Sequence, residues 1–430
     1  MAYNDTANRT FRRVCDAFYQ KNYLQSRPTG WFNKARPVKP SEQDFFVSKG
    51  KCNMKVLITK VTALVCGLVL ISCGGSGSKT TDNKVEVNDT IINFNIEPVK
   101  LEPLKDETLK LKGKDPFGDV IDLKGEQIIV DDLIFRPSEV EMVINDNIMV
   151  MKSRTQDGMF ALLSLPDLQY IKSFGIIGNG PDEFMFPHLC KNTDPNIVAT
   201  VVETTNGKIY DISTDGIMTP NNIKIPKEKS SRMTNGEHPG LMTDTLMYYA
   251  ANSSTGKSVF TIGKTDSIQV SEIQNLALDP KRKGWANYIG DFAINKEQTR
   301  MVYAYKYFKL VRFFDLEHNT VRTINFEREE FDESTQYKIN GLDANVTHYW
   351  GISASEKYVY ILYSGRTPYQ VGSDNNKGNY YIHVEKYDWN GQPIAKYKLD
   401  KWGYFTVDEE DNFLYLVSTN DDSSFFKYKL

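Results

Sequence analysis

From about residue 85 onward, the chain contains short runs of Val, Ile, Tyr and Phe, some alternating with polar residues and some continuous. Runs of this kind predict β-strands. Most of them end at pairs of turn-forming residues, which are Asn145-Asp146, Asp215-Gly216, Thr255-Gly256, His318-Asn319, Asn390-Gly391 and Asp411-Asn412. A helical period is visible only over residues 327–337. The pattern therefore predicts an all-β fold.

One strand type recurs along this region, which indicates a repeat architecture. Its six copies are spaced by 48, 50, 54, 73 and 40 residues when anchored on Leu163, Asp211, Thr261, Asp315, Asp388 and Tyr428. The gap of 73 contains a polar insertion over residues 366–379. Six copies near a 50-residue spacing predict six four-stranded blades of a β-propeller. The alternative is a β-sandwich with a second domain, but six repeats exceed one sandwich.

The last copy ends at the C-terminal residue, so its blade needs a strand from elsewhere. A further strand follows each of the first five copies, at residues 170–174, 222–225, 267–271, 321–326 and 394–399. We expect an N-terminal strand to complete the sixth blade, either at 127–130 or within 97–112. Such a pairing would leave no open edge in the ring. The predicted fold is thus an all-β six-bladed β-propeller over residues 85–430, with an N-terminal strand closing the last blade.

The most hydrophobic stretch precedes this region. Residues 61–71 are 11 uncharged residues that follow Lys55 and Lys60. A membrane-spanning helix needs about 20 apolar residues, whereas a shorter run after positive charges is typical of a secretory signal peptide. An uncleaved signal-anchor helix over 56–72 is the alternative, and Lys60 would interrupt it.

The end of this stretch, Leu70-Ile71-Ser72-Cys73, resembles the lipobox of bacterial lipoproteins. The resemblance implies cleavage before Cys73 and lipidation of its thiol, because two or three acyl chains anchor a protein stably to a membrane. We hypothesise that translation starts at Met54 and that residues 1–53 are an upstream extension; a genuine cytoplasmic or disordered extension is the alternative. Residues 54–72 are then the signal peptide, and the Gly/Ser-rich residues 73–84 are a flexible tether.

Composition and charge fit this division. Of the 430 residues, 40% are hydrophobic and 25% are charged, which excludes wholesale disorder and a multi-span membrane protein. Residues 1–72 hold 12 of the 52 Lys and Arg residues and 4 of the 55 Asp and Glu residues, so this block carries +8. The remainder carries −11 within a net charge of −3. Such a charge gives no general attraction to nucleic acid.

Two segments carry a resemblance to a known family. Residues 174–184, Phe-Gly-Ile-Ile-Gly-Asn-Gly-Pro-Asp-Glu-Phe, are followed by Pro187 and resemble the G-x-G-P-x-E-F segment of TolB-like six-bladed propeller lipoproteins of Gram-negative gut bacteria. Residues 358–366 resemble a second segment of that group. The resemblance implies the propeller fold and a cell-envelope location as an outer-membrane lipoprotein, first on the periplasmic face and second on the cell surface. It implies no reaction.

The motifs that suggest catalysis have simpler explanations. The glycines at 175, 178 and 180 resemble a nucleotide loop, but no helix follows to face a phosphate, so a loop between blades is expected. His188 and Cys190 share a strand face, yet a lone Cys is more often a buried small hydrophobe. The five histidines lack metal-ligand spacing. We therefore expect no catalytic residue, no metal and no cofactor.

The best candidate for a binding site surrounds the polar insertion. Arg366 follows a predicted strand and could hold a carboxylate or phosphate by its planar fork. Tyr363 and Tyr369 could stack on a sugar or peptide, and His348 is a further binding candidate, although blade packing would also explain it. The alternative for the insertion is a mobile surface loop in the polar stretch.

The function predicted from these features is binding. We expect a lipid-anchored, extracytoplasmic propeller that acts as a binding or scaffolding module for a protein, peptide or glycan. A propeller hydrolase or lyase with a site in the central funnel is the alternative. Three or more His, Asp or Glu side chains converging in the funnel would favour the enzyme.

Overall fold

The computed structural model describes residues 101–430 apart from 224–238, 254–255, 264–269, 279–284, 329–330, 336–337, 340 and 422–423. The predicted signal peptide, lipobox and tether lie outside the described residues, as do residues 85–100 and parts of the strands predicted at 222–225 and 267–271. Within the described part, no helix is long and apolar enough to cross a membrane.

The described strands form six blades in chain order, with antiparallel pairing inside each blade, and the first strands of blades two and three also pair with each other in parallel. Blade one is β4 (Glu141–Asn145), β5 (Ile148–Lys152), β6 (Phe160–Ser164) and β7 (Gln169–Phe174). Blade two is β10 (Pro187–Asn192), β11 (Ile197–Glu203), β12 (Lys208–Ser213) and β13 (Met218–Pro220). Blade three is β14 (Pro239–Met242), β15 (Leu246–Ser253), β16 (Gly256–Gly263) and β17 (Val270–Asn275).

Blades four to six complete the ring. Blade four is β18 (Gly290–Ile294), β19 (Arg300–Tyr305), β20 (Leu310–Asp315) and β21 (Thr320–Asn325). Blade five is β22 (Thr347–Ala354), β23 (Tyr358–Arg366), β24 (Ile382–Asp388) and β25 (Pro393–Leu399). Blade six is β26 (Gly403–Val407), β27 (Phe413–Ser418) and β28 (Ser424–Lys429), with one strand from the N-terminal side. The first strands of neighbouring blades contact one another, so they surround the ring axis. The all-β six-bladed propeller predicted from the repeats is confirmed.

The repeat anchors lie at equivalent places. All six belong to the third strand of their blades, namely β6, β12, β16, β20, β24 and β28. The strands predicted at 170–174, 321–326 and 394–399 correspond to β7, β21 and β25. The fourth strand of blade two is β13, which begins at Met218, directly after the turn at Gly216, and ends at Pro220; of the strand predicted at 222–225, residues 224–225 lie outside the described residues.

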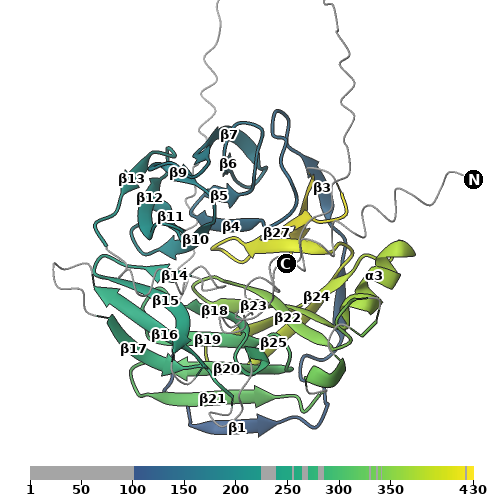
Figure 1. Cartoon of the computed structure of the whole chain (residues 1–430). Helices are drawn as coiled ribbons and strands as arrows, with labels where there is room; N and C mark the ends of the chain where they lie inside the picture. Colours follow the sequence, from purple (N-terminus) through teal and green to yellow (C-terminus); the bar gives the residue numbers. More distant parts are fainter. Residues whose placement is uncertain are drawn as a thin grey trace, which may run out of the picture. The chain divides into compact units, whose positions relative to one another are not determined.

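Residues 101–129, here called the N-terminal belt, run along the outer edges of three blades (Figure 1). Strand β1 (Glu107–Lys110) pairs in parallel with β21, and β2 (Val120–Leu123) pairs in parallel with β25. Strand β3 (Glu126–Ile129) pairs antiparallel with β28 as the fourth strand of that sheet. Of the two segments expected near blade six, 127–130 thus lies there, whereas the one within 97–112 adds a fifth strand to blade four.

The belt is anchored by buried side chains. Leu104 and Phe117 enter the hydrophobic core that blades four and five share, where Trp389 is also buried. The backbone of the belt is held too, because Arg300 donates to the Glu102 carbonyl at 2.6 Å and the Leu104 amide donates to Asp315 at 3.1 Å. Side-chain alternation on each strand buries both faces of most blades, so the cores lie between neighbouring sheets.

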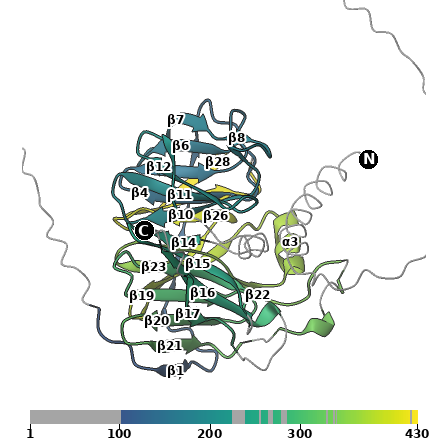
Figure 2. The ribbon, with the colours of Figure 1, turned by 60° about the vertical axis from the view of Figure 1, so that its left-hand side comes forward.

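The polar insertion at 366–379 contains a helix rather than a loop, which corrects the expectation from the sequence. Helix α3 (Pro368–Asn376) connects β23 with β24 and lies beside the sheets (Figure 2). Thr367 is its N-cap and Gln370 completes a capping box, with Pro368 in the first turn. The helical period at 327–337 corresponds to a single 3-10 turn, Glu333–Thr335, among the described residues.

Candidate functional site

The four predicted binding residues all belong to blade five. His348 is in β22, Tyr363 and Arg366 are in β23, and Tyr369 is in α3. The rings of His348 and Tyr363 stack with centroids 6.2 Å apart at an interplanar angle of 12°. Tyr369 is exposed and lines a shallow pocket on α3 with Ser373, Asn376 and Lys377.

The Arg366 guanidinium is engaged by its own blade. One terminal nitrogen lies 2.8 Å from Asp374 of α3, and the other donates to the carbonyl of Tyr381, which precedes β24. The group also lies 3.8 Å from the centroid of the Tyr381 ring. Arg366 therefore fixes α3 on the blade, and an anion at its fork would have to displace Asp374.

The Tyr363 side chain lies so close to the backbone of residue 365 that only a glycine fits there. Gly365 has φ +61°, and a Cβ there would be 2.3 Å from the Tyr363 hydroxyl oxygen. Lys309 Nζ is 4.2 Å and Lys396 Nζ is 4.9 Å from the centroid of the Tyr363 ring. The Tyr363 ring is thus a neighbour both of His348 and of a group of charged side chains.

Those charges centre on Glu385, which is fully buried. Its Oε1 lies 3.2 Å from Lys309 Nζ and 3.6 Å from Lys396 Nζ. Its Oε2 accepts hydrogen bonds of 3.0 Å from the hydroxyls of Tyr349 and Tyr387. Burial lowers the pKa of Lys309, although the Glu385 carboxylate opposes this. The carboxylate is thus the counter-charge that lets two lysines lie inside the blade interface.

His383 extends this group toward the start of β24. Its ring lies between those of Tyr363 and Tyr381, at centroid distances of 6.2 and 5.7 Å. Burial first, and then the nearby cations Lys396, Arg366, Lys398 and Lys309, together lower the pKa of His383 to about 4. The imidazole is therefore neutral at pH 7. His383 is not among the binding residues predicted from the sequence, where its alternation with Tyr381 and Glu385 is the available signal.

Two tryptophans lie next to Arg366. The rings of Trp350 in β22 and Trp402, which precedes β26, meet edge to face at 5.5 Å. Lys306 Nζ is 4.9 Å from the Trp350 ring, and the Arg366 guanidinium is 5.6 Å from the Trp402 ring. Both tryptophans are half-buried. We call Lys306, Trp350, Arg366, Tyr381 and Trp402 the Trp–Arg cluster, and the side of the ring where β22 and β26 begin and α3 lies the α3 face.

A second polar group lies between the first strands of blades one and two. Glu141 of β4 is 2.7 Å from Lys152 Nζ and 2.9 Å from His188 Nδ1, and it accepts a 2.8 Å bond from the Leu189 amide. Since Lys152 ends β5 and His188 is near the start of β10, the group lies on the side of the α3 face.

At the opposite ends of the first strands, one side chain crosses the ring. Lys191, near the end of β10, donates to the carbonyl of Ala354, the last residue of β22, at 2.7 Å and pairs with Glu409 after β26. Blade two is thereby joined to blades five and six, on the far side of the ring axis.

Cys190 lies in the core rather than in a site. It is buried among residues that include Val202 and Met247, and burial raises the pKa of its thiol. A thiol in this environment is a poor nucleophile. The interpretation of Cys190 as a buried small hydrophobe is confirmed.

The glycine-rich segment forms a loop between blades one and two, as expected. Strands β8 (Ile176–Ile177) and β9 (Glu183–Phe184) pair within it, and β10 rather than a helix follows. The Glu183 carboxylate accepts a 2.7 Å bond from the Gly180 amide, and a Cβ on Gly178 would lie 2.0 Å from it. The protein's own carboxylate thus occupies the place that a phosphate would need.

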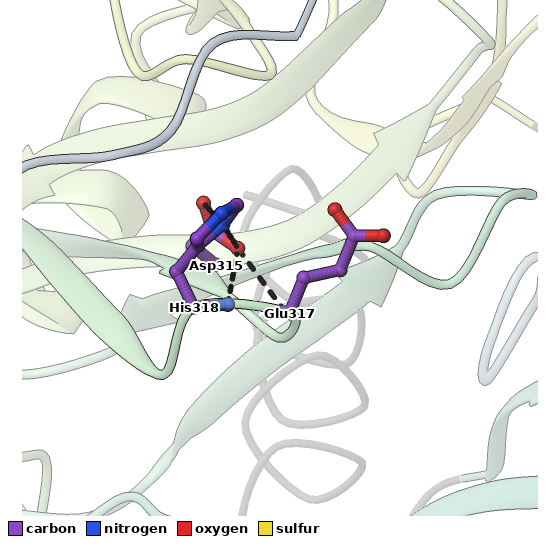
Figure 3. A group of neighbouring side chains, drawn as sticks. All are labelled: Asp315, Glu317 and His318. Atoms are coloured by element: carbon purple, nitrogen blue, oxygen red, sulfur yellow. Dashed lines mark hydrogen bonds and ion pairs between the residues drawn. The ribbon is translucent and has the colours of Figure 1, made fainter.

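Among the residues that the structure describes, one group of side chains has metal-ligand geometry: Asp315, Glu317 and His318 at the β20–β21 turn (Figure 3). Asp315 already accepts bonds from the amides of Leu104, Glu317 and His318 and lies 3.0 Å from Arg300. Its oxygens therefore hold the turn and the belt together. The turn between the third and fourth strands also places the group away from the ring axis.

The comparisons with known proteins agree with this architecture. Residues 117–410 match the family model described as TolB-like 6-blade propeller-like. The match covers more than half of the chain, which therefore belongs to the TolB-like six-bladed propeller family. A search of the curated proteins finds no match.

Several solved structures are similar to this chain at low sequence identity. A member of the DUF4221 family from Bacteroides vulgatus is 11% identical, with a TM-score of 0.50 over 74% of this chain and 98% of that chain. TolB from Acinetobacter baumannii is 10% identical, with a TM-score of 0.35 over 68% and 63%. A catalytically inactive virginiamycin B lyase from Staphylococcus aureus with quinupristin is 10% identical, with a TM-score of 0.37 over 72% and 99%.

Proposed function

We propose that this protein is an extracytoplasmic, lipid-anchored binding or scaffolding module whose α3 face receives a protein, peptide or glycan. The lipid would be attached at Cys73, and the outer membrane would be the location, with the periplasmic face first and the cell surface second. The signal-peptide pattern and the lipobox support export and anchoring. The tether of residues 73–84 would let the ring stand off the membrane.

The Trp–Arg cluster is the observation that carries the proposal. Tryptophan, tyrosine and arginine are the residues most enriched among those that dominate binding energy at interfaces. Here the three aromatic rings are half-buried, Arg366 is buried, cation–π contacts link these rings to Lys306 and Arg366, and the exposed Tyr369 lies on the adjoining helix. Residues held in place before binding lose little entropy when a partner is bound.

The other side of the ring offers less for a partner at the axis. There the Lys191 side chain crosses from blade two to Ala354 and Glu409, so it occupies the region between the first strands. A ligand near the axis would therefore approach from the α3 face.

Site-specific photo-crosslinking in intact cells tests the proposal. A photoreactive residue at Tyr369 on the α3 face should yield a discrete adduct, whereas one at Ile217, which is 57% exposed on the opposite face, should not. Adducts from Ile217 alone, or equal adducts from both positions, would contradict the assignment of the face. Cleavage of a supplied glycan or peptide by the purified protein would support the hydrolase or lyase alternative instead.

A further inference from the structure

His383 belongs to a row of side chains that crosses blade five. In the register of the sheet, Tyr363 of β23 lies opposite His383 of β24, His383 lies opposite Lys398 of β25, and Lys398 lies opposite Asp122 of β2. Directly opposed residues project from the same face of a sheet. The row therefore runs from the interior at Tyr363 to the edge of the blade at Asp122.

Two tyrosine rings flank His383, and each ring makes cation–π contacts with two cationic side chains. Lys309 and Lys396 lie over the Tyr363 ring at 4.2 and 4.9 Å. The other ring, Tyr381, carries Arg366 at 3.8 Å and Lys398 at 5.3 Å. Four positive charges thus surround one imidazole.

The counter-charges are distributed unevenly among these cations. Lys309 forms an ion pair with Glu385, and Lys396 forms one with Asp115. Arg366 forms an ion pair with Asp374. The partner of Lys398 is Asp122, at 3.6 Å, and the side chains of this pair are 44% and 78% exposed. Such an exposed ion pair contributes little and is readily exchanged for another. In addition, Nδ1 of His383 is buried and makes no hydrogen bond to any residue that the structure describes.

We propose that His383 and Lys398 form a binding site for an oxyanion, a carboxylate or sulfate group carried by the partner. Lys398 would exchange Asp122 for the anion, and the imidazole would donate a hydrogen bond to it. The remaining cations would supply attraction without direct contact. An acidic group is thus the chemistry that this part of the α3 face would recognise. Only the source of the anion, the bound partner, rests on the proposed function.

Binding of an anion at this site predicts a change in the pKa of His383 that a purely structural role of His383 would not produce. The four cations disfavour a proton on His383, and a bound anion offsets them. By linkage, the anion must then raise the pKa of His383 and bind more tightly as the imidazole becomes protonated. Sulfate is a suitable probe because its charge stays constant between pH 4 and pH 8.

The experiment is an NMR titration of the His383 imidazole in the full chain, with sodium sulfate and with sodium chloride at equal ionic strength. We expect sulfate to raise the pKa of His383 by about one unit more than chloride, which corresponds to about tenfold tighter binding by the protonated form. Lys398→Met should abolish most of the difference, whereas Lys377→Met, at the exposed C-cap of α3, should leave it unchanged.

Equal effects of sulfate and chloride would show screening alone and overturn the proposal. Wild-type behaviour of Lys398→Met would also overturn it. Methyl glucuronide and N-acetylglutamate then distinguish a sugar-borne from a peptide-borne carboxylate by their relative affinities. The proposed function is tested separately, since crosslinking at Tyr369 can succeed while sulfate has no effect.

Discussion

Replacing Phe117 by alanine should loosen the N-terminal belt from blades four and five. The Phe117 side chain is 8% exposed, and its ring meets Tyr387 edge to face at 5.2 Å and an angle of 78°. Lys396 Nζ lies 5.8 Å from the same ring and is hydrogen-bonded to Asp115 at 2.7 Å. Phe117 is therefore the aromatic anchor between β1 and β2.

The expected loss of stability follows from this burial. Truncation of a buried Phe to Ala costs about 3–5 kcal/mol, including the cavity that remains. Phe117 lies at the margin of its core, where the belt can collapse into part of the space, so we expect a loss of about 3 kcal/mol. At about 2 °C per kcal/mol for a domain of this size, the midpoint of thermal unfolding should fall by about 6 °C.

Two measurements check this expectation. Urea unfolding should give the loss in free energy, and hydrogen exchange should show faster exchange in β2 and β25 than elsewhere in the ring. Phe186→Ala is the matched control, because this Phe is 55% exposed and its loss should cost less than about 0.5 kcal/mol. A loss below about 1 kcal/mol for Phe117→Ala, or exchange raised equally in blade one, would refute the assignment of the belt as a buried anchor.

Three further outcomes follow from the described contacts and the sequence. The pKa of His383 falls from its ordinary 6.5 to about 4 on folding, so the unfolded chain takes up the proton first and stability is lost as the pH falls from about 6.5 to 4. His383→Gln should remove about 2 kcal/mol of that loss, after allowance for solvent screening, in urea unfolding at both pH values. A double-mutant cycle on Lys191 and Glu409 should give a coupling of about 1 kcal/mol that decreases with salt, and no coupling would contradict the contact across the ring. Cys73→Ala should release the protein from membranes or leave it unprocessed in cell fractionation, and normal membrane retention would exclude lipidation.

The six blades could be predicted because the repeat has a local cause. Asp315 and Asp388 end their third strands and accept hydrogen bonds from the backbone amides of the turns that follow. An aspartate that stabilises its own turn must stand at a fixed place after the apolar strand residues. The repeated sequence of an aromatic residue, Asp and an apolar residue, as in Phe314-Asp315-Leu316 and Tyr387-Asp388-Trp389, is therefore visible without knowledge of the fold.

The belt could be predicted only in part. The segment at 127–130 contains an apolar run, and β3 lies there. Strands β1 and β2 have four residues each, and none of their side chains is fully buried. Their pairing with β21 and β25 depends on partners more than 200 residues away in the chain. Nothing in so short a segment specifies such a partner, although Phe117 shows that a buried anchor lies between them.

The helix α3 could have been predicted from its first residues. Thr367, Pro368 and Gln370 are a complete start signal, since the Thr side chain accepts from the Gln370 amide and the Gln side chain accepts from the Thr367 amide. The composition of residues 366–379, which is polar and rich in Asn and Gly, favoured a loop instead. Local hydrogen bonds determined the start of this short helix more than its average propensity did.

The charged group of blade five could not be predicted, because the sequence does not reveal the register of its strands. Along β24 and β25, the positions of His383, Glu385, Lys396 and Lys398 have the spacing of residues that share a face, which is apparent from the sequence. Their register is not apparent, and it is the register that sets His383 opposite Lys398 and Glu385 opposite Lys396. A shift by one residue would place Glu385 opposite Ala395 or Tyr397 and take its carboxylate away from Lys396. The buried pair of Glu385 and Lys396 therefore favours one register, and the same register places a neutral imidazole among four cations.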